Sequence, residues 1–392
     1  LLVAGYIGYE VGAALELVGP GDTLTRPQAR GSLGLAPAGY NVATAPGDAN
    51  LPDAALYAFP SDALSPSQDL RSSRASEPLH RDLATTTQLP EDLRRQRADF
   101  IGAVRTALQA IAAGRYYQIN VSSRFETGAA VGGVTLPLED ALRRLRAPQP
   151  VPFGMAVPVG ETRYFSLSME RFLAVRPSAS GGRIARSRPI KGTSARGLAP
   201  ATDAAQRLAL LASEKERAEN TMIVDMVRND LARVADMGGV RVTQLLEAVP
   251  YRTLWHLESE VQASLPQQTS ATQLLQATLP PASVTGCPKV AAMTAIALLE
   301  GRRRGPYCGT LGVWHPDGRA DLSVAIRGIA MRDTRAWLDV GAGIVADSRP
   351  EAEWEEICLK ARAALRGLAA VADVPVGAAA AEIASVAAPG WG

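Results

Sequence analysis

The amino-acid sequence predicts a mixed fold of helices and strands, and three observations support this. Apolar residues recur at helical spacing over residues 90–113, and Gly114 provides a natural end for that helix. The run 116–126, YYQINVSSRFE, alternates apolar and polar residues as a half-buried strand does. Further helical patterns over about 203–235 and over 350–371 enclose more strand-like runs, so the chain combines both kinds of element.

The remaining elements follow in chain order. Residues 1–16 are expected to hold a strand and a short turn, and residues 20–81 are expected to be loops joining short strands. The pattern then predicts a helix at 138–146, strands at 152–157, 164–176 and 240–262, helices at 271–278 and 288–300, and strands at 308–314, 321–331 and 336–341. Residues 177–204, with the segment SRPIKGTSARG, are expected to form an exposed loop.

Composition narrows the classes of partner. An apolar share of 47% and a charged share of 20% are those of a soluble globular protein, and a net charge of +2 argues against nucleic-acid or membrane-surface partners. Glu10 and Glu16 interrupt the apolar start, which argues against a signal peptide or membrane span, and the missing initiator Met suggests a truncated start. Cys287, Cys308 and Cys358 lie far apart, in no metal-ligand spacing, so a cytoplasmic location is expected.

Two predicted helices carry carboxylates at helical spacing. Glu216 and Glu219 lie three residues apart in one helix, and Glu353, Glu356 and Lys360 form one stripe in the last helix. Oxygen ligands without His or Cys suit Mg²⁺ rather than Zn²⁺. The alternative is a solvated face with ordinary Glu–Lys pairs, and spacing alone favours that alternative.

Lys191 lies close to Arg186 and Arg188 on the Gly-flanked segment RSRPIKG. A nucleophilic lysine must lose its proton, and neighbouring positive charges favour that loss. A basic loop that stays solvated is the alternative.

Several Gly- or Pro-rich segments could contact an anionic ligand. Gly341 and Gly343 are expected between a strand and a helix, where backbone N–H groups could hold a carboxylate, and a tight turn is the alternative. Similar turns could place Thr285, Lys289 and Tyr307 in a cleft. Arg327 is a further candidate, because it lies within the apolar run LSVAIRGIAM. A charged side chain in a buried strand needs an anionic partner.

Long segments occur in the same order as in a known family. They are AGRYYQINVSSRF, SRPIKGT, SEKERAENTMIVDMVRNDLARV, SVTGCPK, RRGPYCGTLG, VAIRGI and GAGIVADSRPEAEWEEICLKARAAL. Together they resemble the chorismate-binding enzymes. The resemblance implies an α+β sandwich of antiparallel sheets flanked by helices, like component I of anthranilate synthase, with the active site in the cleft between the sheets. It also implies an N-terminal part of the fold in 1–89, truncated at its start, a chorismate-binding catalytic region in 90–370 and an Ala/Gly-rich tail in 371–392.

The resemblance also implies roles for individual residues. Lys191 would be the nucleophile and Glu170, in SMERF, the general acid that protonates a departing hydroxyl. Glu219 and Glu356 would bind Mg²⁺ directly, and Glu216 and Glu353 would bind it through water. The residues expected to bind the substrate are Gln118, Thr193, Thr285, Tyr307, Arg327, Gly341, Gly343 and Lys360.

Three positions distinguish the reactions of the family. Isochorismate and salicylate synthases have a lysine where this chain has Gln118. Anthranilate-forming members have the motif PIAGT where this chain has PIKGT with Lys191, and they have a histidine where this chain has Asn220. The resemblance therefore implies conversion of chorismate and ammonia to 4-amino-4-deoxychorismate, on the route to p-aminobenzoate and folate. Since no glutaminase site is recognisable, ammonia is expected from a glutamine amidotransferase subunit. The alternatives are anthranilate formation and a non-catalytic chorismate-binding relative.

Overall fold

The structure is a computed structural model, and it describes residues 2–7, 54–59, 91–127, 136–148, 150–159, 161–179, 181–251, 254–315, 317–333 and 335–372. Most of the loops predicted for 20–81, and the Ala/Gly-rich tail beyond residue 372, lie outside the described residues.

Among the described residues, the larger of two sheets has nine strands, and every neighbouring pair is antiparallel. In sheet order the strands are β2 (Ala54–Phe59), β1 (Leu2–Ile7), β12 (Thr310–Trp314), β13 (Ala320–Val324), β6 (Arg171–Pro177), β7 (Arg183–Arg188), β10 (Leu254–Leu265) and β8 (Ile190–Ala195), with β9 (Val240–Pro250) also paired to β10. Both β7 and β8 pair with β10, at different positions along it.

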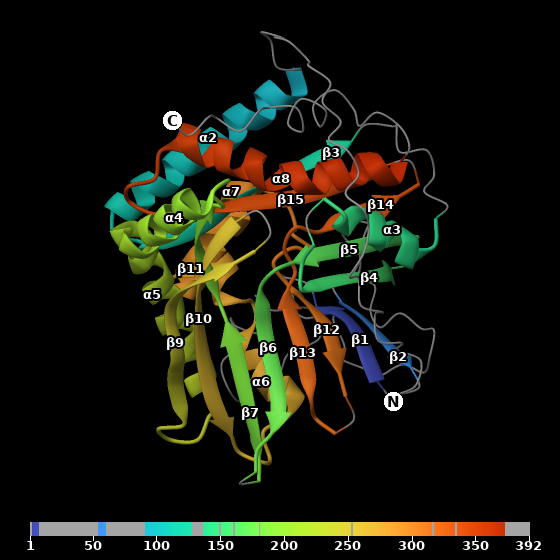
Figure 1. Cartoon of the computed structure of the whole chain (residues 1–392), viewed down its shortest axis with the longest axis vertical. Helices are drawn as coiled ribbons and strands as arrows, with labels where there is room; N and C mark the ends of the chain where they lie inside the picture. The colour runs from blue at the N-terminus through green and yellow to red at the C-terminus, as the bar shows by residue number, and fades with distance from the viewer. Residues whose placement is uncertain are drawn as a thin grey trace.

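The smaller sheet has six strands, and it too is antiparallel. In sheet order they are β11 (Gly286–Cys287), β3 (Gln118–Thr127), β15 (Arg335–Ile344), β14 (Ile329–Arg332), β5 (Thr162–Ser168) and β4 (Phe153–Val159). In Figure 1 these strands cross the upper part of the molecule, and most of the larger sheet runs down the lower part. The observed architecture confirms the predicted α+β class with antiparallel sheets.

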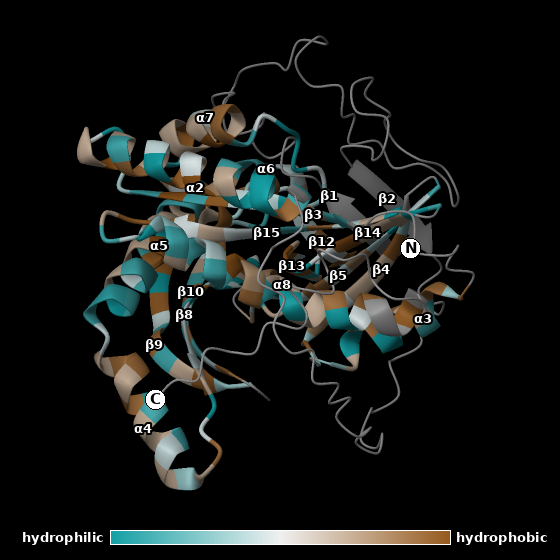
Figure 2. Ribbon diagram, turned by 90° about the horizontal axis from the view of Figure 1, so that it is seen from above, coloured by the Kyte–Doolittle hydropathy of each residue, from teal (hydrophilic) through white to brown (hydrophobic). Residues whose placement is uncertain are grey.

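The helices are α2 (Glu91–Ala112), α3 (Leu138–Arg146), α4 (Pro200–Ala212), α5 (Glu214–Ala232), α6 (Ala271–Thr278), the 3₁₀ turn η1 (Ala282–Val284), α7 (Lys289–Glu300) and α8 (Pro350–Ala372). Helices α2 and α8 lie over the smaller sheet, whereas α5 packs against β8, β9 and β10 (Figure 1). Hydrophobic residues gather on the inner strands, and hydrophilic ones are frequent on α5 (Figure 2). Within the described residues, no helix is long and apolar enough to cross a membrane.

An aromatic cluster joins three of these elements in the core. The ring of Trp354 on α8 lies 5.8 Å from that of Phe100 on α2 and 5.9 Å from that of Phe125 on β3. All three side chains are buried, and burying large rings of this kind stabilises the packing of both helices on the sheet.

The structure corrects four predictions about the elements. The strand expected over 164–176 is two strands, β5 and β6, which belong to different sheets. The single helix expected over 203–235 is two helices, because Ser213 has an extended backbone and caps α5 by accepting a hydrogen bond from the N–H of Glu216 at 3.4 Å. The strand expected over 321–331 is interrupted, because Arg327 has a φ of +54° between β13 and β14. The loop expected over 177–204 contains β7 and β8, because both segments pair with β10, a strand that is distant in sequence.

Candidate active site

Four elements that are distant in sequence converge at Gly343. The sequence placed Gly341 and Gly343 after a strand, but both lie inside β15, opposite Ser122 and Asn120 of β3. A Cβ atom on Gly343 would lie 3.0 Å from Gln118 Nε2, 3.0 Å from Lys191 Nζ and 3.9 Å from a carboxylate oxygen of Glu219.

The absence of a side chain at Gly343 therefore leaves room for the polar groups of β3, β8 and α5 to meet. Gln118 is only 2% exposed, and its Oε1 has no hydrogen-bond partner within the described residues. Such a buried acceptor is suited to a ligand that donates a hydrogen bond.

A second glycine brings β8 close to α5. Gly192 has a φ of +95°, a conformation that side chains other than glycine rarely adopt. A Cβ atom there would lie 3.1 Å from Glu216 Oε2 and 3.0 Å from the Cβ of Leu257. The Lys191–Gly192 backbone can thus lie directly against the carboxylates at the start of α5.

The charges around Lys191 differ from those expected. Arg186 donates a hydrogen bond to Gln262 at 3.1 Å, and Arg188 forms an ion pair with Glu260 at 3.0 Å, so both arginines are directed towards β10. The groups that interact electrostatically with Lys191 are the carboxylates of Glu170, Glu216 and Glu356. The contacts of the two arginines with β10 therefore give no support to their proposed action on Lys191, whose Nζ lies beside Gly343.

Glu170 lies in the connection between β5 and β6 and is 5% exposed. Burial is the largest influence on the pKa of Glu170 and the charge of Glu258 adds to it, whereas Ser283 and Lys191 lower the pKa. Together these influences raise the pKa of Glu170 to about 7. A carboxyl group with this pKa holds a proton in much of the population at neutral pH, as a general acid requires.

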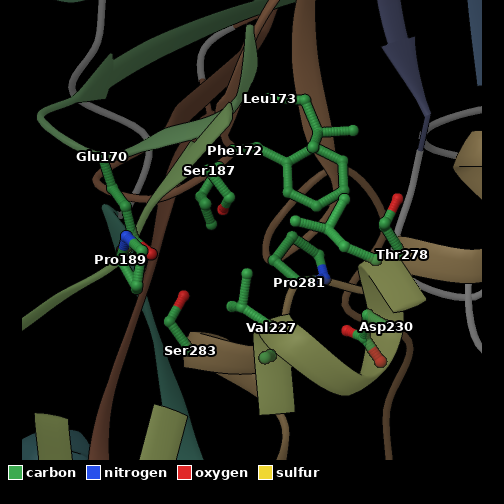
Figure 3. A pocket seen from close by; sticks show the side chains of 13 residues that line it. Glu170, Phe172, Leu173, Ser187, Pro189, Val227, Asp230, Thr278, Pro281 and Ser283 are labelled. Carbon is green, nitrogen blue, oxygen red and sulfur yellow. The ribbon is translucent and has the colours of Figure 1, made fainter. Parts of the chain in front are cut away.

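A pocket lies beside Glu170 (Figure 3). Figure 3 shows Glu170 and Pro189 at one end of the pocket, Asp230 at the other, and Ser283 between them. Ser283 is 6% exposed, and its hydroxyl lies close enough to Glu170 to lower the pKa of that carboxyl group. Ser283 of η1 thus places a polar group beside the candidate acid.

The four glutamates expected to bind Mg²⁺ influence one another across α5 and α8. Burial first, and then the charge of Glu219, raises the pKa of Glu216, and the charge of Glu356 on α8 raises it further. Burial and the charge of Glu356 likewise raise the pKa of Glu353, whereas Lys360 lowers the pKa of Glu356. This partly buried negative charge suits a divalent cation. In the described part of the chain, however, no three potential ligands are close enough to form a metal cluster.

A group of cationic and phenolic side chains surrounds Gly341. Lys360 Nζ donates to the carbonyl oxygen of Gly341 at 3.2 Å and pairs with Glu356, and Arg327 donates to the carbonyl oxygen of Lys360 at 2.8 Å. The hydroxyl of Tyr307 lies 2.9 Å from the place of a Cβ on Gly341. Arg327 lies between strands rather than within one, and burial lowers its pKa. Two cations and a phenol next to Gly341 could hold an anionic group.

The two predicted threonines have different surroundings. Thr285 is 1% exposed and its hydroxyl is directed at the carbonyl oxygens of Pro281 and Ala282, at 3.3 and 3.0 Å. Thr193 Oγ1 lies 3.2 Å from Nδ1 of His256, which sequence reasoning missed. Burial lowers the pKa of His256 to about 4, so its ring is neutral at neutral pH. A single histidine in a strand carried no motif that could have identified it.

Comparisons with known proteins find a family model and several relatives that match the chain. A family model described as chorismate binding enzyme matches residues 1–366. An aminodeoxychorismate synthase of Streptomyces griseus is 37% identical over 304 residues, which are 78% of this chain and 41% of that protein. Anthranilate synthase component 1 of Streptomyces coelicolor is 38% identical over 272 residues, which are 68% of this chain and 51% of that protein. The chain thus spans about half or less of the length of these relatives.

The fold has a counterpart among solved structures. Anthranilate synthase component I from Streptococcus pneumoniae superposes with a TM-score of 0.67 at 27% identity, covering 92% of this chain and 80% of that one. The α+β sandwich expected from the motifs is thereby confirmed. Because the family model covers nearly the whole chain, and this solved structure shares its fold, the chain belongs to the family of chorismate-binding enzymes.

Proposed function

We propose that the chain forms 4-amino-4-deoxychorismate from chorismate and ammonia. The observation that carries the proposal is the pairing of a lysine and a protonated carboxyl group in one site. Lys191 Nζ lies over Gly343, and the carboxyl group of Glu170 lies within electrostatic range with a pKa of about 7. One group can attack carbon, and the other can supply a proton.

In the proposed reaction, Lys191 Nζ attacks C2 of chorismate, the ring double bonds shift, and the bond between C4 and its hydroxyl oxygen breaks. Glu170 gives its proton to the departing hydroxyl, which leaves as water. Ammonia then adds at C4, the double bonds shift back, and the lysine leaves C2 as the free amine. The new C4 ammonium group gives one proton back to Glu170, which restores the acid. One ammonia is consumed and one water is released, and the enolpyruvyl group is retained.

The remaining site residues would bind the substrate and a cation. Arg327, Lys360 and Tyr307 near Gly341 would hold a carboxylate of chorismate, and Gln118 would accept a hydrogen bond from the ring substituents. The glutamates of α5 and α8 would hold Mg²⁺, which would neutralise the ring carboxylate. The proposed ammonia source is a glutamine amidotransferase subunit, and the designation "component 1" of a similar Klebsiella aerogenes protein, 41% identical over 243 residues, supports a partner of this kind.

Anthranilate formation is the second candidate, because relatives of that name are about as similar as the aminodeoxychorismate synthases. Incubation with chorismate, Mg²⁺ and ammonium, followed by mass analysis of product and protein, separates the candidates. An amine that retains the enolpyruvyl group supports the proposal, and anthranilate with free pyruvate refutes it. A protein without any chorismate turnover, with or without a chelator, would be a binding relative.

The role of Lys191 is tested in the same assay. Lys191→Ala should lose amination by at least about a thousandfold, since it removes the nucleophile, and the mass of a chorismate adduct on the protein should disappear. Arg186→Gln is the matched control, because it removes a neighbouring basic group that is directed towards β10. Equal loss in both variants would instead favour a basic segment that binds substrate only through its charge.

A further inference from the structure

Lys191 lies in a β-bulge. The register between β8 and β10 shifts between His256 and Glu258, so that Lys191 and Gly192 together oppose the single residue Leu257. Bulges of this kind redirect a side chain, and the positive φ of Gly192 makes the distortion possible. The carbonyl groups of the bulge then need hydrogen-bond donors from elsewhere.

One side chain of α5 supplies those donors. Asn220 is 1% exposed, and its Nδ2 donates to the carbonyl oxygen of Leu257 at 3.0 Å and to that of Lys191 at 3.3 Å. Its Oδ1 accepts a hydrogen bond from the hydroxyl of Ser259 at 2.5 Å, and that hydroxyl accepts one from the N–H of Leu246 at 3.0 Å. Each partner fits one orientation of the amide, because two carbonyl oxygens can only accept.

We propose that Asn220 is a positioning residue that clamps this bulge and thereby holds the amine of Lys191 over Gly343. The inference rests on the proposed function insofar as Lys191 is the nucleophile. Without the amide, two buried carbonyl groups would lose a donor, and β8 could relax towards a regular register with β10. A shift of one residue turns a strand side chain to the opposite face of its sheet, so Lys191 would leave the cleft.

The clamp can be tested without any substrate, because the chain has only four lysines: Lys191, Lys215, Lys289 and Lys360. Trace acetylation with acetic anhydride, followed by peptide mass analysis, gives the labelling of Lys191 relative to Lys215. In Asn220→Ala this ratio should change by at least about threefold, because the position of the reacting amine governs its rate. In the control Ser259→Ala, which keeps both bonds from Nδ2, the ratio should stay within about twofold of wild type.

Turnover provides the second readout. Asn220→Ala should lower kcat by at least about tenfold and change the KM for chorismate far less, because Arg327, Lys360 and Tyr307, which would hold a carboxylate of chorismate, lie outside α5 and β8. Asn220→His, whose ring N–H can donate to one carbonyl, should recover part of kcat, and it replaces the alanine variant if that does not fold.

The outcomes separate the clamp from the function. An unchanged labelling ratio in both Asn220 variants overturns the clamp, whatever the reaction. Equal losses of kcat in Ser259→Ala and Asn220→Ala also overturn it, because they indicate general loss of packing. If the ratio changes as expected but wild-type protein forms no adduct with chorismate, the clamp stands and the proposed function fails.

Discussion

Replacing Glu170 by Gln should stabilise the folded protein at alkaline pH while removing the proposed proton donor. The carboxyl group is 5% exposed, and burial, the largest influence, raises its pKa from the ordinary value of 4.5 to about 7. At 1.36 kcal/mol per unit of pKa, the difference corresponds to roughly 3 kcal/mol of folding free energy.

The sign follows from where the proton is held. Because the folded state binds it more tightly than the unfolded chain, the contribution of Glu170 to stability is fully present below about pH 4.5 and is lost as pH rises through about 7. Gln has no such proton. The free energies of unfolding of wild type and Glu170→Gln should therefore agree near pH 4.5, and the variant should be more stable by about 3 kcal/mol above pH 8.

Urea unfolding at a series of pH values measures this difference directly. Glu355→Gln is the control, because it removes an exposed carboxylate from α8 and should show no comparable divergence. A difference in the free energy of unfolding between wild type and Glu170→Gln that stays constant from pH 4.5 to 8.5 would refute the reasoning.

In the same variant, kcat for amination should fall by about 10²–10⁴, and wild-type activity should decline as pH rises through about 7.

Three further predictions concern other parts of the molecule. Gly343→Ala should lower amination at least about tenfold without unfolding the protein, because its Cβ would lie 3.0 Å from Nε2 of Gln118 and from Nζ of Lys191, the ends of two long side chains. The control is Gly102→Ala in α2, which should keep full activity because no atom lies within 4 Å of the new Cβ. Glu353→Gln should weaken Mg²⁺ binding in calorimetry by about 10–100-fold, whereas Glu355→Gln should not, and equal affinities would exclude Glu353 from the cation site. Lys289→Met should lower the free energy of unfolding in urea by about 3–5 kcal/mol, because it removes the buried cation 2.7 Å from Asp230. The control is Arg335→Gln, which breaks the exposed ion pair with Glu126 and should change the free energy of unfolding by less than about 1 kcal/mol. Similar losses in both variants would contradict this prediction.

Elements governed by local interactions were predictable from the sequence. The helix expected at 138–146 is α3 with the same bounds, and its acidic first turn and basic last turn complement the helix dipole. The helix expected at 271–278 is α6, where Ser270 and Gln273 form a capping box. The segment 177–204 was mispredicted, because its Arg and Ser side chains resemble those of a loop until β10 is present to pair with them.

The composition of the candidate site followed from the sequence, but its arrangement did not. The glutamates of α5 and α8 were candidates by their spacing and Lys191 by its basic segment, whereas Glu170 and the expected roles came only from the resemblance to chorismate-binding enzymes. That Lys191 meets Gln118 over a glycine, while Arg186 is directed away, depends on strands paired across long stretches of chain. Side chains alternate along a strand, so a single bulge in β8 decides which face a lysine occupies. That register is set by β10 and α5, which no local pattern around Lys191 contains.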